Sequence, residues 1–284
     1  MSNWYDKYLE VYERPFSEVP EDIIKGTRER LAALQSDEPL ASIVIIAYNE
    51  SARLQACLWS LSEMQCKYPI EIIGVDNDSA DNTREVYEQS GIPFYTETRH
   101  SCGYARQCGL EHARGKYYMD VDADTLYPPH YFELMIERLM RPGVVAVSAL
   151  WGYFPGERHS RLSLAVFEMC RDLFLWVQHF KRPELSVRGL VFGYDATYGR
   201  KEPYRVDIKR GEDGSMALAL KKYGRICFVY DRRTRAITGY GTLNEKSLVQ
   251  SLWKRIKIQG RGLTRIFYSQ DHYDDTPDNM IDNP

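Results

Sequence analysis

The sequence lacks several features that define large classes of proteins. No stretch of its 284 residues reaches the roughly 18 consecutive apolar residues of a membrane-spanning helix, which argues against an integral membrane protein. The first residues contain no basic stretch followed by an apolar run, so no secretory signal is expected. The six cysteines are scattered without a C-x-x-C pair, so neither disulfides nor a thiolate zinc site are predicted. These absences predict a soluble, cytoplasmic protein.

The composition indicates a globular chain with an unevenly charged surface. With 44% hydrophobic and 13% aromatic residues the chain can bury a large core, which excludes a disordered protein. The net charge is only −3, yet 17 Lys and Arg stand against 6 Asp and Glu between Arg200 and Arg265. Such a basic segment indicates either an anionic partner or a solvated face, and composition leaves both open.

Apolar runs alternate with helical patterns through the first half of the chain. Residues 42–47 are continuously apolar and rich in β-branched side chains, which is typical of a strand buried on both faces. The same reasoning predicts further strands at 71–75, 93–95, 116–119 and 144–148, with helices at 51–62 and 103–114, before Tyr87 and after Pro129. This alternation predicts an α/β fold with a mainly parallel, Rossmann-like sheet flanked by helices.

The pattern weakens after residue 150. An apolar helix is predicted at 162–180, another helix at 215–223 and a basic helix at 246–258, between short strands. Because no repeat or low-complexity linker interrupts the chain, residues 41–265 are expected to form one domain. A helical extension, 1–40, precedes it, and an acidic tail that we expect to be disordered, 266–284, follows.

Polar clusters follow three of the predicted strands, at 47–50, 76–81 and 120–124. Ligands of open α/β sheets bind at the carboxyl ends of the strands, where these clusters lie. In the last cluster, Asp122 and Asp124 stand two residues apart and would repel each other without a cation. Hard carboxylate oxygens select Mg²⁺ or Mn²⁺, although Asp124 could instead cap the helix that follows Pro129.

Four motifs, taken in their order along the chain, together resemble bacterial-type members of glycosyltransferase family 2. This family comprises nucleotide-sugar transferases of GT-A fold. They are Ile43–Glu50, Val75–Thr83, the string from Arg99 to Pro129 that holds Asp122 and Asp124, and Gly211–Gly224. The resemblance extends from residue 41 to about 240. It implies a nucleotide-sugar half, 41–150, and an acceptor half, 151–265, with a mixed C-terminal architecture.

The resemblance implies roles for residues on the donor side. Asp124 would contact a Mn²⁺ or Mg²⁺ ion, and Asp122 would hold the ribose or assist the metal. Gly103 would permit close backbone approach, and Arg106 would offer a cation to the diphosphate. The nucleoside pocket would be formed by Ala47, Tyr48, Glu50, Asp76 and Asn77.

On the acceptor side, the resemblance makes Asp213 the general base. The acceptor hydroxyl must lose its proton as it attacks, and a single displacement would invert the anomeric carbon. Glu212, Arg200 and Trp253 are further acceptor-side candidates. The expected activity is transfer of one sugar from a nucleoside diphosphate sugar, a UDP-sugar above others, to a hydroxyl of a glycan or lipid-linked acceptor.

Some features depart from the family pattern and leave alternatives open. The second motif reads Asp76-Asn77-Asp78-Ser79, which leaves the base preference undetermined, and Gln250–Arg255 does not match the Q-x-x-R-W of processive synthases. A polyprenyl-phosphate glycosyltransferase and a nucleotide-sugar-binding pseudoenzyme remain alternatives. Nucleic acid is not an expected partner, because no recognised nucleic-acid-binding module is present.

The basic helix expected at 246–258 admits two interpretations. Leu248, Leu252 and Ile256 form an apolar stripe flanked by cations, which suits peripheral docking on an anionic membrane. The same pattern suits a helix packed on the core with its cations outward. The first interpretation would place the protein on the inner face of the membrane.

Overall fold

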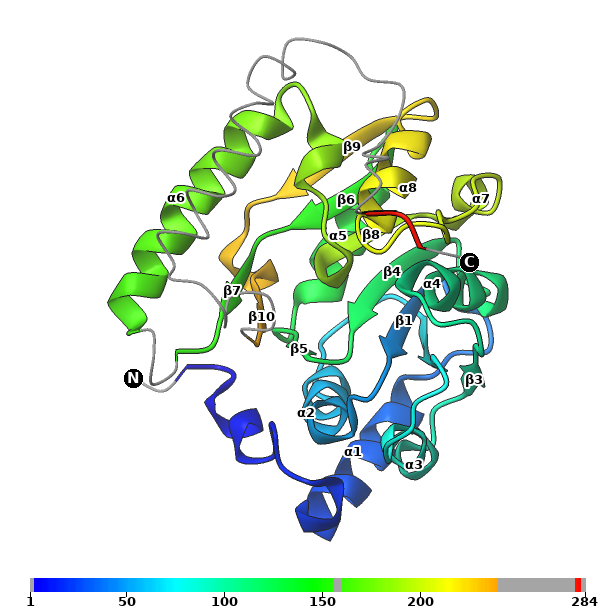
Figure 1. Cartoon of the computed structure of the whole chain (residues 1–284), viewed down its shortest axis with the longest axis vertical. Helices are drawn as coiled ribbons and strands as arrows, with labels where there is room; N and C mark the ends of the chain where they lie inside the picture. Colours follow the sequence, from blue (N-terminus) through cyan, green and yellow to red (C-terminus); the bar gives the residue numbers. More distant parts are fainter. Residues whose placement is uncertain (1–2, 156–159, 240–278, 282–284) are drawn as a thin grey trace.

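The computed structural model describes residues 3–155, 160–239 and 279–281 (Figure 1). Its main sheet has the strand order β3-β2-β1-β4-β8-β6-β9. The strands are β1 (Ala41–Ala47), β2 (Ile70–Asp76), β3 (Phe94–Thr96), β4 (Tyr117–Asp122), β6 (Val144–Ala149), β8 (Phe192–Asp195) and β9 (Arg225–Val229). β8 runs antiparallel to both of its neighbours, while the other pairs are parallel. The predicted α/β fold with a mainly parallel sheet is confirmed.

Helices cover both faces of this sheet. They are α1 (Glu21–Leu34), α2 (Ser51–Ser62), α3 (Thr83–Ser90), α4 (Cys102–His112), α5 (Tyr131–Leu139), α6 (Arg161–His179), α7 (Ala196–Gly199) and α8 (Glu212–Leu220). Along β1, Ile43 and Ile45 pack into the core shared with α1, α2, α3 and α5, while Val44 packs into the core shared with α4 and α8. Both clusters consist of buried apolar side chains, which explains why the central strands read as unbroken apolar runs.

A small second sheet supports the end of β4. It joins β5 (Thr125–Leu126), β10 (Ala236–Thr238) and β7 (Trp151–Tyr153), in that order. β5 follows the acidic cluster directly, so pairing with β10 fixes the chain immediately after Asp124. The strands are too short for their alternation to be read from the sequence.

The N-terminal residues are helical, as expected, and they pack into the main core. Two 3₁₀ turns, η1 (Asp6–Glu10) and η2 (Phe16–Glu18), precede α1. Tyr8 and Val11 are buried in the core that α2 shares, and the Tyr12 hydroxyl donates to the Asp124 carbonyl at 2.9 Å. The N-terminal segment therefore contacts the acidic loop directly. The domain boundaries expected at 40, 150 and 265 stay a prediction.

Two expectations on the later part of the chain have different outcomes. The helix predicted at 162–180 is α6, and that predicted at 215–223 begins three residues earlier as α8. The basic helix 246–258 and most of the acidic tail 266–284 lie outside the described residues. Within the described ranges, no helix is both long and apolar enough to cross a bilayer.

Candidate active site

The three polar strand-end clusters meet at one edge of the sheet. In the register of the parallel strands, Ala47 of β1 pairs with Asp76 of β2, and Ile46 pairs with Asp122 of β4. The carboxyl ends of the three strands are thus level with one another. This brings together the residues expected to contact the nucleotide and those expected to hold a metal.

The acidic loop after β4 is held from several sides. The Asp124 carboxylate accepts a hydrogen bond from the Thr125 hydroxyl at 3.0 Å, and the Asp122 backbone N–H donates to the Tyr127 hydroxyl at 3.4 Å. Asp124 does not cap the following helix, because α5 begins at Tyr131 and His130 occupies its N-cap. The capping interpretation of Asp124 is therefore wrong, and its carboxylate is held by Thr125 rather than by a helix end.

Negative charge accumulates at this loop. Burial raises the pKa of Asp124, and the neighbouring Asp122 raises it further. Burial raises the pKa of Glu50 to about 7, while Arg53, with its Nε 3.0 Å from the Glu50 carboxylate, opposes that shift. Raised carboxyl pKa values indicate that ionising these groups together is unfavourable without an additional cation. The donor set therefore fits a hard divalent ion.

The protein donors alone do not complete such a site. Among the residues that the structure describes, no group of three or more His, Cys, Asp and Glu side chains is arranged around a common point as a metal site would require. Mg²⁺-type ions are commonly held by one or two carboxylates together with substrate phosphates and water. Asp122 and Asp124 fit that incomplete type.

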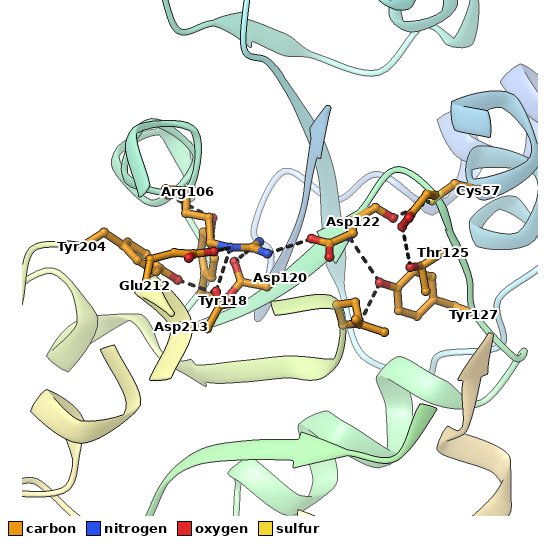
Figure 2. A network of polar contacts seen from close by, with 12 residues as sticks. Cys57, Arg106, Tyr118, Asp120, Asp122, Thr125, Tyr127, Tyr204, Glu212 and Asp213 are labelled. Atoms are coloured by element: carbon orange, nitrogen blue, oxygen red, sulfur yellow. Dashed lines mark hydrogen bonds and ion pairs between the residues drawn. The ribbon is translucent and has the colours of Figure 1, made fainter. Parts of the chain in front are cut away.

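Arg106 occupies the centre of a buried ionic cluster (Figure 2). Its side chain is only 2% exposed. Four carboxylates lie within ion-pair distance of the guanidinium: Asp120 at 2.9 Å, Asp122 at 2.7 Å, Asp213 at 2.8 Å and Glu212 at 3.7 Å. The guanidinium therefore joins the end of β4 to the start of α8. This differs from the expectation of a cation available to a diphosphate, because its charge is already shared among protein carboxylates.

Desolvation controls protonation in this cluster. Burial raises the pKa of Asp213 to about 8 and that of Asp120 to about 8, although Arg106 acts against both shifts. One guanidinium cannot neutralise three buried carboxylates and the partly exposed Asp122, so the cluster retains protons near neutral pH. A carboxyl group with a pKa close to the working pH is well suited to exchange protons with a substrate.

Several residues that sequence reasoning missed complete the cluster. A Cβ on Gly189 would lie 1.9 Å from the Arg106 Nη2, so only glycine allows the guanidinium this position. Tyr204 donates to the Asp120 Oδ2 at 3.1 Å and lies 3.0 Å from the Tyr194 hydroxyl. Tyr118 donates to the Arg106 carbonyl. Only tertiary packing reveals these contacts, and no motif pointed to them.

The residues expected to form the nucleoside pocket line the ends of β1 and β2. Asp76 is buried and accepts a hydrogen bond from the Ser79 backbone N–H, while Ala47 accepts one from the Asn77 N–H at 2.9 Å. The Asn77 amide donates to the Glu97 and Arg99 carbonyls, both at 2.8 Å. Tyr48 is half exposed, with its ring centroid 5.3 Å from that of His100. Hydrogen bonds to the backbone thus fix Asp76 and Asn77, whereas the Tyr48 side chain remains accessible to solvent.

The remaining candidates fall in different places. Glu212 lies beside Arg106 in the cluster. Gly103 is needed for packing, because a Cβ there would lie 2.3 Å from the Arg205 carbonyl oxygen. Arg200 donates to the Ala113 carbonyl, beyond the amino end of β4, so the structure does not bring it to the site. Trp253 lies outside the described residues.

Known proteins of similar structure carry the same fold. A mannosyltransferase of Pyrobaculum calidifontis, solved with GDP-Man and Mn²⁺, matches 87% of this chain and 73% of its own at a TM-score of 0.58 and 16% identity. The glucosyl-3-phosphoglycerate synthase of Mycobacterium tuberculosis was solved with Mn²⁺, UDP-Glc and phosphoglyceric acid. Its match covers 89% of this chain and 87% of that protein, with a TM-score of 0.52 and 16% sequence identity. At this identity the likeness shows only the fold, which is GT-A.

Sequence comparison identifies the family. The uncharacterized glycosyltransferase YfnE of Bacillus subtilis is 36% identical over 91 residues, which are 30% of this chain and 23% of that protein. The chain therefore spans about a quarter of that relative's length. The profile described as Glycosyl transferase family 2 matches residues 42–198. Because this match covers more than half of the chain, the protein belongs to glycosyltransferase family 2.

Proposed function

We propose that this enzyme transfers a single sugar, with inversion, from a nucleoside diphosphate sugar to a hydroxyl of a glycan or lipid-linked acceptor. One observation carries the proposal: Arg106 joins the acidic end of β4 to Asp213 at the start of α8. Asp122, on the donor side, and Asp213, on the acceptor side, thus both contact the Arg106 guanidinium. The structural neighbours that bind GDP-Man or UDP-Glc together with Mn²⁺ support a nucleotide-sugar donor, for which we favour a UDP-sugar.

On the donor side, Asp122 and Asp124 would hold Mn²⁺ or Mg²⁺ together with the diphosphate. When bound, such an ion offsets the charge that develops on the leaving nucleoside diphosphate. Asp76 and Asn77 would orient the nucleoside, since their backbone and side-chain bonds to neighbouring loops hold them in place. Tyr48, which is half exposed, would cover the base.

On the acceptor side, Asp213 would accept the proton of the attacking hydroxyl. Its raised pKa, about 8, makes its carboxylate a stronger base than an exposed aspartate. Arg106 would act as a positioning residue, because it contacts Asp213 and Asp122 but is itself buried beneath them. Its fixed guanidinium would keep the base at a constant distance from the donor side.

Nucleotide binding tests the donor side. We expect calorimetric titration with UDP, GDP, CMP and dTDP to show saturable binding of one nucleotide that depends on Mn²⁺. Asp124→Ala should abolish the Mn²⁺ dependence, whereas Asp37→Ala, at an exposed loop before β1, should not. Absence of binding by every nucleotide, with the protein folded, would refute the proposed donor site.

The role of Asp213 is tested by kinetics. Release of UDP from the preferred UDP-sugar, with water as the acceptor, needs no knowledge of the natural acceptor. Asp213→Asn should lower kcat by at least about 10² with little change in the donor KM, the usual size of a lost general base. An unchanged kcat would contradict a base at Asp213.

A further inference from the structure

The N-terminal segment, residues 3–19, is attached to the rest of the fold through aromatic side chains. Tyr8 packs edge-on against Trp59 of α2, with 5.1 Å between the ring centres. Tyr5 packs in the same way against Phe154, which directly follows β7 of the small sheet, at 5.7 Å. Figure 1 shows this segment, in dark blue, beside α2. The segment is therefore held both by α2 and by the small sheet.

Tyr12 brings this segment to the loop that carries Asp124. Its ring centre lies 4.7 Å from that of Phe154, and its hydroxyl donates to the Asp124 carbonyl at 2.9 Å. The hydroxyl fits closely at this point, because a Cβ on Gly239 would lie only 2.7 Å from it. The charges of Asp124 and Glu50 both act on the hydroxyl. Tyr12 therefore lies where the loops after β1 and β4 meet.

The backbone beside Tyr12 is strained. Glu13 has a φ of 61°, in the left-handed region that residues other than glycine seldom adopt, although its side chain is exposed. Such a conformation persists only where the surrounding contacts enforce it. Val11 is fully buried directly before Tyr12, and its carbonyl accepts a hydrogen bond from the Arg14 N–H at 3.4 Å. The packing of Val11 and Tyr12 thus holds a turn that directs the tyrosine toward the acidic loop.

We propose that Tyr12 is a positioning residue for the acidic loop, so that the N-terminal segment is part of the donor site. This inference rests on the proposed function, in which Asp122 and Asp124 hold a divalent ion together with the diphosphate. Asp124 lies in the turn between β4 and β5, so a bond that fixes its carbonyl also limits where its carboxylate points. Tyr12 acts through Asp124. The family match begins at residue 42, so it does not include this segment.

The expected size of the effect follows from the small number of protein ligands. Two carboxylates would hold the ion, and no third acid, His or Cys joins them among the residues that the structure describes. The direction of each carboxylate therefore matters more than in a complete protein cage. Replacing a residue that orients a metal ligand commonly weakens metal binding by about 10- to 100-fold. Because Thr125 also holds the Asp124 carboxylate, we expect the lower end of this range for Tyr12.

Calorimetric titration separates this role from a general loss of stability. UDP, GDP, CMP and dTDP are titrated, with and without Mn²⁺, into the full chain and into two variants. Tyr12→Phe should raise the Kd of the Mn²⁺-dependent complex about tenfold and leave binding without Mn²⁺ unchanged. Tyr8→Phe is the matched control, because it removes a hydroxyl of the same segment that donates to the Glu63 Oε2 at 2.8 Å, at the carboxyl end of α2. It should leave both affinities unchanged.

Hydrogen exchange supplies a second measurement, which needs no ligand. Peptides that cover residues 120–127 should exchange faster in Tyr12→Phe than in the unmodified protein or in Tyr8→Phe. The inference alone is overturned if exchange in the loop is unchanged, or if Tyr12→Phe retains the full Mn²⁺-dependent affinity. An equal loss of affinity in Tyr8→Phe would also overturn it, since the effect would then reflect the stability of the segment. If the unmodified protein shows no Mn²⁺-dependent binding, the proposed donor site fails and the inference fails with it.

Discussion

Replacing Arg106 with Met is the most informative single perturbation of the ionic cluster. Methionine retains most of the apolar stem but removes a charge that contacts Asp120, Asp122 and Asp213 at 2.7 to 2.9 Å. Removing one partner of a buried ion pair typically costs about 3–5 kcal/mol, because the remaining charge stays buried. We expect a destabilisation in that range at pH 7.

The pH dependence of this loss can be worked out from the cluster. Without Arg106, the folded variant must hold about one more proton than the folded unmodified protein, on a carboxyl group whose ordinary pKa in the unfolded chain is 3.8. Protonating a group of that pKa costs about 1.4 kcal/mol per pH unit above it, which gives roughly 1.6 kcal/mol at pH 5 and 4.4 at pH 7. Because the folded state holds the extra proton, stability relative to the unmodified protein falls as pH rises.

Urea unfolding at pH 5, 6 and 7 measures this slope. Arg84→Met, which removes an exposed i,i+4 pair with Glu88, is the control and should change stability by no more than about 0.5 kcal/mol. A loss below about 1 kcal/mol for Arg106→Met at pH 7, or a loss that does not grow with pH, would refute the assignment of Arg106 as the balancing charge.

Three further predictions concern the same cluster. Gly189→Ala should displace Arg106, destabilise the fold by about 1–3 kcal/mol in urea unfolding and reduce activity, and an unaffected variant would show that the guanidinium moves freely. Tyr204→Phe removes the hydroxyl that donates to Asp120 Oδ2, while Arg106 still donates to Oδ1, and should cost about 1–3 kcal/mol by the same measurement. With saturating substrates, the rate should rise with pH through about 8 as Asp213 loses its proton, and Asp213→Asn should lack this limb.

The placement of the site could be predicted because it depends on local patterns. Strands with buried apolar runs end at Ala47, Asp76 and Asp122 and lead into polar loops, and parallel pairing of β1, β2 and β4 brings these ends to one edge of the sheet. The sequence also indicated the helix behind Asp213, through the resemblance of Gly211–Gly224 to the acidic motif of the family and the helix that follows it. Short-range order thus sufficed for the sheet edge and the acidic loop.

The environment of Arg106 could not be predicted, because its partners come from distant parts of the chain. An arginine near the start of a helix reads as an exposed cation, and nothing in the spacing from Asp120 to Asp213 indicates a shared guanidinium. Gly189 is required only by close approach in the folded state. The antiparallel direction of β8 between β4 and β6 likewise depends on pairing between distant parts of the chain, which periodicity does not encode.

The burial of Arg106 has a consequence for the proposed metal. If its guanidinium moved to a diphosphate, it would leave Asp120 and Asp213 buried without a cation, at a cost of several kcal/mol. A bound diphosphate would meanwhile add negative charge beside Asp124, whose pKa the buried setting and Asp122 already raise. Arg106 therefore has no charge to spare for the leaving group. In the proposed mechanism compensation would come from elsewhere, and a divalent ion held by Asp122, Asp124 and the diphosphate would supply it without disturbing Asp213.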